Sequence, residues 1–189
     1  MAVITITEGN RVLRDPDEIV AFLRPFGIWY RRFEGLADVA DDASDEQILA
    51  AFEAPIQEQM ATGGYTTADV IDLQPTIQGL DEMLARFSSE HWHSEDEVRF
   101  IVRGRGVFHI HPRDAPVFRL EVREGDMINV PRGTHHWFDL CEEKRIRAIR
   151  LFQDRSGWTP HYTESGEEAR HEPVCLGPAW IPPGPRRRS

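Results

Sequence analysis

The chain has 189 residues, of which 40% are hydrophobic, and a formal net charge of −10 at pH 7. A chain of this length and composition can bury a substantial core, so we expect a folded globular protein. The acidic balance argues against binding to the phosphates of nucleic acids. The sequence also contains no apolar run of about 18 residues, which a membrane span would need.

The N-terminus and the cysteines indicate where the protein works. The first residues lack a positively charged region followed by an apolar stretch, so we expect no signal peptide. The two cysteines, Cys141 and Cys175, are too few for a disulfide framework. We therefore expect free thiols and a cytoplasmic protein.

The start of the chain predicts strands with a helix between them. Residues 3–7 (VITIT) and 27–34 (GIWYRRFE) have strand character. The helix between them should begin after an N-cap at Asp15 and end by Gly27.

A second helix is predicted over residues 44–64. Ser44 and Gln47 have the spacing of a capping box, and Gly63–Gly64 is a stop signal. Pro55 lies inside this pattern and should kink or split the helix.

The rest of the chain predicts mostly short strands. Residues 68–76 look extended, and residues 77–87 form a predicted helix that ends at Phe87. The following segments are rich in β-branched and aromatic residues and are separated by Gly, Pro or Asp turns, which is typical of an antiparallel sandwich or barrel. They are residues 98–102, 106–112, 116–126, 127–131, 136–140 and 145–152.

No linker-like composition divides these parts. We expect a single domain over residues 1–180, with a helical N-terminal part and a barrel over approximately 88–155. Residues 181–189 are rich in proline and arginine and should form an irregular tail.

Side chains directly after the last predicted helix indicate a metal site. His91, His93 and Glu97 are all at odd positions, and so is Arg99. Side chains of an extended segment alternate between two faces, so these four would project to the same side. Imidazole and carboxylate groups suit a borderline divalent ion such as Fe, Ni, Zn, Cu or Co.

A further ligand has to come from a neighbouring strand. His135 and His136 follow a turn at Pro131 and Gly133, and either histidine can complete the site. Three histidines and one glutamate leave two positions of an octahedron open, as in catalytic sites. One carboxylate leaves a divalent ion with net positive charge, which favours an anionic oxygen substrate.

The other histidines are not expected to be ligands. His109 and His111 have no acidic partner at ligand spacing and should lie at the surface or on an edge strand. His161 and His171 lie in polar surroundings and should be solvated.

The two metal segments resemble the two motifs of the cupin family. The matching residues are His91-Trp92-His93, Glu97 and Gly104 in the first motif, and Gly125-Asp126, Pro131, Gly133 and His136 in the second. This resemblance implies a mainly β protein with flanking helices, built around a cupin-type double-stranded jelly-roll barrel with the ion inside.

A narrower resemblance is to the acireductone dioxygenase family of methionine salvage. It is carried by the segments EHWHSEDEVRFIVRGRGVF, VPRGTHHWFDL and RAIRLF, and it extends roughly from Ile4 to Trp158. In that family the ligand is the histidine directly before the aromatic residue of the second segment, which selects His136 over His135. Bacterial relatives often carry proline where this chain has His135.

The resemblance implies a metal-dependent dioxygenase that cleaves acireductone, 1,2-dihydroxy-5-(methylthio)pent-1-en-3-one, with O2. One Fe2+ or Ni2+ per chain would be held by His91, His93, Glu97 and His136. In this family the Fe2+ form gives formate and 4-methylthio-2-oxobutanoate, and the Ni2+ form gives formate, CO and 3-methylthiopropanoate. The sequence does not choose between them.

The resemblance also implies roles for individual residues. Glu97 and Arg99 are the expected catalytic residues, and Arg99 should bind the anionic substrate. The alternative for Arg99 is a buried ion pair with a ligand carboxylate. Phe87 and Phe138 should line the substrate pocket, and the alternative for them is ordinary barrel packing.

Two other functions fit the same ligands. One is another cupin dioxygenase or isomerase that acts on a related keto-enol compound, and the other is a non-catalytic ligand-binding cupin. We find no basic helix-turn-helix segment, so we expect no nucleic-acid partner. A barrel that encloses its own site needs no second subunit, so we expect a monomer whose partners are acireductone and O2.

Overall fold

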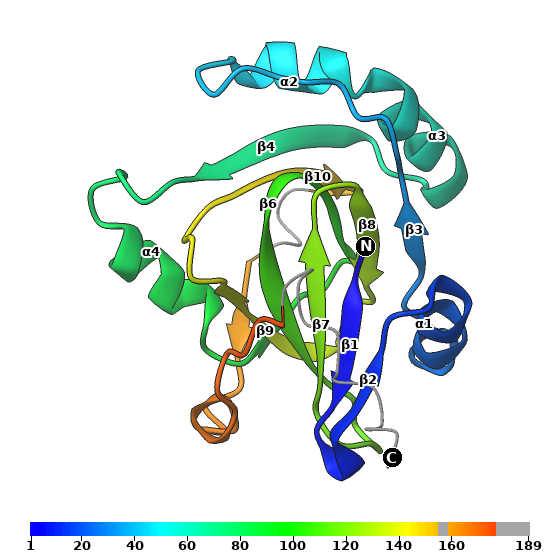
Figure 1. Ribbon diagram of the computed structural model, residues 1–189, viewed down its shortest axis with the longest axis vertical. Helices are drawn as coiled ribbons and strands as arrows, with labels where there is room; N and C mark the ends of the chain where they lie inside the picture. The colour runs from blue at the N-terminus through cyan, green and yellow to red at the C-terminus, as the bar shows by residue number, and fades with distance from the viewer. Residues whose placement is uncertain (155–158, 177–189) are drawn as a thin grey trace, which may run out of the picture.

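The structure is a computed structural model that describes residues 1–154 and 159–176 (Figure 1). The expected tail at residues 181–189 lies outside the described residues. The strands are Val3–Ile6 (β1), Arg11–Leu13 (β2), Tyr30–Arg32 (β3), Thr67–Leu73 (β4), His91–Trp92 (β5), Glu97–His111 (β6), Phe118–Arg123 (β7), Asp126–Val130 (β8), His135–Leu140 (β9), Ile146–Phe152 (β10) and His161–Tyr162 (β11). The helices are Pro16–Leu23 (α1), Asp45–Ala51 (α2), Glu53–Gly63 (α3) and Leu80–Phe87 (α4), with 3-10 turns at Glu8–Asn10 (η1), Arg24–Phe26 (η2) and Glu168–Arg170 (η4).

Antiparallel strands form two sheets that share β6. One sheet has the order β11-β5-β9-β6-β7-β1-β2, and the other has the order β3-β8-β6-β10-β4. Figure 1 shows the two sheets curving around a common interior, with helices outside. The predicted fold class, a jelly-roll barrel with flanking helices, is therefore confirmed. Within the described ranges, no helix is long and apolar enough to cross a membrane.

The strand β6 is continuous over 15 residues, so the expected division into strands at 98–102 and 106–112 is wrong. Its first half pairs with β8 and β10, and its second half pairs with β7 and β9. The change of sheet occurs at Gly104, whose φ is +77° and where a Cβ would lie 2.2 Å from the Arg145 carbonyl oxygen. Glycine therefore lets the strand bend without ending.

Strands from the N-terminal part of the chain complete both sheets. β1 pairs with β7, β3 pairs with β8, and β4 pairs with β10 along its whole length. The sheets therefore include strands from outside residues 88–155.

Capping side chains begin the first two helices where the sequence predicts them. The Asp15 carboxylate accepts hydrogen bonds from the backbone N–H groups of Asp17 and Glu18 at the start of α1. Ser44 and Gln47 form both halves of a capping box at the start of α2. These bonds satisfy N–H groups that have no partner within the helix.

Helices α2 and α3 are two pieces of the helix predicted over residues 44–64. The split falls at Phe52, whose φ of −114° and ψ of 21° are not helical. Pro55 lies in the first turn of α3, where its missing N–H breaks no helical hydrogen bond. Phe52 packs edge-on against Phe100 of β6, with ring centroids 5.5 Å apart, so the helices cover the outer face of the second sheet.

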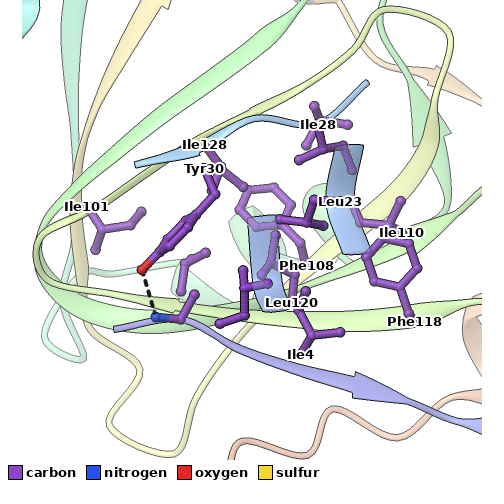
Figure 2. Close-up of a cluster of buried hydrophobic side chains, with 14 of the residues drawn as sticks. Ile4, Leu23, Ile28, Tyr30, Ile101, Phe108, Ile110, Phe118, Leu120 and Ile128 are labelled. Carbon is purple, nitrogen blue, oxygen red and sulfur yellow. Dashed lines mark hydrogen bonds between the residues drawn. The ribbon is translucent and has the colours of Figure 1, made fainter. Parts of the chain in front are cut away.

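The interior of the barrel is mostly apolar, and polar side chains gather near one end of β6. Figure 2 shows Phe108, Leu120 and Ile128 together in this core, with Leu23 of α1 beside them. Side chains alternate along β6, so Phe100 points outward to the helices. Glu97 and Arg99, at the alternate positions of the strand, face the interior.

The two cysteines form a disulfide, so the expectation of free thiols is wrong. The segment after β11 folds back along the barrel, where the Leu176 backbone N–H donates to the Glu121 carboxylate and Arg119 donates to the Glu172 carbonyl. This return places Cys175 beside Cys141, which is 34 positions earlier in the sequence. The cysteines therefore no longer support a reducing compartment.

Candidate metal centre

Four buried side chains from three parts of the chain meet inside the barrel. His91 lies on β5, Glu97 begins β6 and His136 lies on β9, directly opposite His91 in the β5–β9 pairing. One potential ligand atom from each of these three and one from His93 all lie within 4.8 Å of one another. Each of the four side chains belongs to a residue that is at most 6% exposed.

The sequence predicted one extended strand for the segment that carries His91, His93 and Glu97. The structure instead has two strands there, β5 and β6. Residues 93–96 form a turn between β5 and β6. The turn is fastened to the β8–β9 connection, because the Gly133 N–H donates to the His93 carbonyl and the Arg132 N–H donates to Asp96. His91, His93 and Glu97 therefore meet, as their shared parity predicted, although the segment that carries them is only partly extended.

Backbone carbonyls orient two of the imidazole rings. His91 Nδ1 lies 2.7 Å from the Ser89 carbonyl oxygen, and His136 Nδ1 lies 2.8 Å from that of Thr134. A carbonyl oxygen only accepts, so each Nδ1 carries the proton and each Nε2 keeps its lone pair. This is the tautomer that a metal ligand with Nε2 coordination requires.

The spacing of the inner atoms fits a cation. His136 Nε2 lies 2.8 Å from Glu97 Oε2, and His93 Nε2 lies 3.4 Å from the same oxygen. A lone pair and a carboxylate approach this closely only with a proton or a metal ion beside them. Two ligands at right angles on one ion, each at about 2.1 Å, lie about 3 Å apart.

The charge of the cluster is set by Glu97. Burial alone would raise the pKa of its carboxyl, but the charge of Arg99 and the close contacts with His136 and His93 hold this pKa well below its usual range. Burial and the neighbouring His136 lower the pKa of His91 to about 4. At neutral pH the cluster therefore offers a carboxylate and a neutral His91, which are the protonation states that bind metals.

The cluster forms the polar end of a cavity of about 480 Å³. Arg99, Phe87 and Phe138 all line this cavity. The remaining wall is mostly apolar and includes Ile71, Leu73, Ile101, Phe108, Ile146 and Ala148.

The match to a family model extends over most of the chain. The model of the ARD/ARD′ family matches residues 16–160.

The chain belongs to this family.

Two curated relatives give the extent of the likeness to ARD/ARD′ family members. Acireductone dioxygenase of Picosynechococcus sp. is 40% identical over 176 residues, which cover 93% of this chain and 100% of that protein. Acireductone dioxygenase of Stutzerimonas stutzeri is 42% identical over 169 residues, which cover 86% of this chain and 93% of that protein. The resemblance of the three sequence segments to the acireductone dioxygenase family is thereby confirmed.

A solved structure extends the likeness to three dimensions. It is acireductone dioxygenase from Bacillus anthracis with cadmium ion in the active center, and its TM-score is 0.79 at 36% identity. The match covers 86% of this chain and 98% of the other. The ARD/ARD′ family member described here therefore shares the fold of that enzyme over most of its length.

Sequence reasoning missed several cavity residues of this ARD/ARD′ family member. Arg150 of β10 lies opposite Arg99 in the β6–β10 pairing and forms a two-point ion pair with Asp69 of β4. Tyr162 of β11 also lines the cavity, and its hydroxyl donates to the Arg86 carbonyl. The alternation in 145–152 could have indicated Arg150, but nothing local indicates that β11 returns to the cavity.

The remaining histidines differ partly from expectation. His109 is fully buried and stacks on Trp137 with ring centroids 4.7 Å apart, so its predicted surface position is wrong. His161 is exposed and stacks on Trp92. His171 is half-buried and lies 3.0 Å from Glu167, so it is not simply solvated.

Proposed function

We propose that this chain is a metal-dependent dioxygenase that cleaves acireductone with O2 in methionine salvage. The observation that carries the proposal is the buried cluster of three histidines and one glutamate at the polar end of an apolar cavity, in a chain of the ARD/ARD′ family. His91, His93, Glu97 and His136 would hold one Fe2+ or Ni2+ per chain. Imidazole and carboxylate donors suit both ions.

A divalent ion held by these four residues would supply a Lewis acid for the oxygens of the enediolate. The products would be formate and 4-methylthio-2-oxobutanoate for the Fe2+ form. They would be formate, CO and 3-methylthiopropanoate for the Ni2+ form.

Arg99 would orient both a ligand and the substrate. Its Nε donates to Glu97 Oε1 at 2.6 Å, which directs the other carboxylate oxygen, Oε2, toward His136. The guanidinium also lines the cavity, and its side chain is 11% exposed. A positive charge held there with little water favours the anionic enediolate over a neutral compound.

The apolar wall would bind the methylthio tail and exclude water. Phe138 packs on Phe108 with ring centroids 4.7 Å apart, so this part of the wall is well supported. Phe87 at the end of α4 also lines the cavity. An apolar tail gains about 25 cal/mol for each Å² that it buries against such a wall.

We also propose that the chain works as one unit and as a monomer. The support is that the cavity lining described here comes from strands β4, β5, β6, β9, β10 and β11, from helix α4 and from adjoining residues of a single chain. No second subunit is required to complete this cavity.

The proposal is tested by the absorbance of acireductone in the presence of metal-free, Fe2+-loaded and Ni2+-loaded protein. The absorbance should persist without oxygen and fall when O2 is admitted, with both metal-loaded forms and not with the metal-free form. The absence of oxygen-dependent turnover with either metal would refute the proposal.

A matched pair of histidine variants assigns the activity to the cluster. His136→Ala removes one of four ligands and should abolish turnover and lower the retained metal. His171→Ala removes a histidine that lies outside the cavity lining and should keep both. Equal loss in the two variants would show that the activity does not depend on this cluster.

A further inference from the structure

A second cluster of metal-binding side chains lies on the outer face of the sheet that carries the first. It consists of Glu90, His111 and His135, and one potential ligand atom from each lies within 4.8 Å of the others. None of the three belongs to the ligand set of the barrel site. This cluster has the same donor types as a borderline divalent metal site.

Strand geometry places the two clusters back to back. In the β6–β9 pairing, Ile110 lies opposite His136 and His111 lies opposite His135. Cross-strand partners share a face and successive residues alternate, so His111 and His135 share the face opposite to His136. Glu90 directly precedes His91 and its side chain likewise reaches the outer histidines.

The carboxylate of this cluster is held in position before any ion binds. Glu90 is 2% exposed, and its Oε2 accepts hydrogen bonds from the hydroxyls of Thr163 and Ser165. Its Oε1 lies 2.5 Å from His111 Nδ1. A buried carboxylate oriented by two hydroxyl groups is the arrangement expected of a supported metal ligand.

Two small adjustments would close a site. Glu90 Oε1 and His111 Nδ1, now 2.5 Å apart, have to separate by about 0.5 Å or more, and His135 has to approach Glu90. His135 Nδ1 lies 4.0 Å from Glu90 Oε2, and the His135 side chain is 45% exposed. Two ligands of one ion at about 2.0–2.1 Å lie about 3–3.5 Å apart. Rotations of the His111 and His135 side chains, which are 33% and 45% exposed, can supply both differences.

The cluster also has an approach from solvent. His111 and His135 line a hollow of about 580 Å³ on the outside of the barrel. Arg113 and Arg132 line the same hollow and would favour an anionic co-ligand beside a bound ion.

We propose that Glu90, His111 and His135 form a second site for a borderline divalent ion such as Zn2+ or Co2+. The site is weaker than the barrel site because two of its ligands are partly open to water. An ion held there ties β6 and β9 to the residue before His91 and, through Thr163 and Ser165, to the segment after β11.

Co2+ titration of chelator-treated full-length protein tests the proposal by calorimetry and by the visible absorbance of the bound ion. Wild-type protein should bind two equivalents, and His111→Ala/His135→Ala should bind one. His136→Ala should keep the outer equivalent. His161→Ala, which removes an exposed histidine outside both clusters, should still bind two.

The single variant His135→Ala keeps the bond between His111 and Glu90 and guards against loss of folding. It should weaken the second binding step by about tenfold or more, since even changes in supporting residues cost about 10–100-fold. Binding of one equivalent of Co2+ by both wild type and His111→Ala/His135→Ala would overturn the proposal. The outer cluster would then be only a hydrogen-bonded pair of Glu90 and His111. These readouts use no acireductone, so they do not depend on the proposed function.

Discussion

Replacement of Glu97 by glutamine changes the charge at the centre of the cavity and keeps its shape. Glu97 is 3% exposed and accepts a hydrogen bond from Arg99 Nε at 2.6 Å. In Glu97→Gln the buried guanidinium loses its nearest negative charge. Removal of one partner of a buried ion pair costs about 3–5 kcal/mol, so we expect a loss of this size in the free energy of unfolding.

A double-mutant cycle on metal-free protein measures this coupling. Urea unfolding at pH 7 would compare wild type, Glu97→Gln, Arg99→Met and the double variant. The double variant should lose about 2 kcal/mol less than the sum of the single variants, because neither charge is then left buried without the other. Losses that add to within about 0.5 kcal/mol would refute the reasoning, since independent sites behave in that way.

Three further outcomes are expected. Cys141→Ser/Cys175→Ser should lower the free energy of unfolding by about 3–4 kcal/mol, because the disulfide closes a 34-residue separation. In metal-free protein the free energy of unfolding should fall by about 3 kcal/mol as the pH falls from 6.5 to about 4. The cause is His91, whose imidazole is protonated in the unfolded state at a higher pH than in the folded state. Gly106→Ala should raise the KM for acireductone by about tenfold, or about 1.4 kcal/mol, since its Cβ would lie 2.1 Å from the Phe138 ring.

Each outcome has its own check. Denaturant curves in the presence of a reductant should shift for wild type and stay unchanged for the double serine variant, and identical shifts would contradict the disulfide. The acid loss should be smaller in His91→Gln than in wild type, and equal losses would assign it to other groups. For Gly106→Ala the metal content should be unchanged, and a parallel loss of metal would mean that the substitution disturbs the site itself.

The local chemistry of the site could be predicted from the sequence. His91, His93 and Glu97 lie close together in the chain, so spacing alone grouped them, and the turn that breaks the strand preserved the grouping. The choice of His136 required knowledge of the family. Strand periodicity favours neither His135 nor His136 unless the pairing of β9 with β5 is known.

Long-range returns of the chain could not be predicted. The disulfide depends on the segment after β11 folding back to Cys141, and no local pattern encodes that path. The burial of His109 depends on Trp137 of the neighbouring strand, which covers it. The bend at Gly104 that joins two predicted strands likewise depends on the contact with Arg145.

Anomalous diffraction at the metal edge from crystals of Ni2+-loaded protein tests the central claim most directly. The account predicts that the strongest peak lies inside the barrel, at about 2.0–2.2 Å from ligand atoms of His91, His93, Glu97 and His136. A strongest peak elsewhere, or a barrel peak without contact to these four side chains, would contradict it.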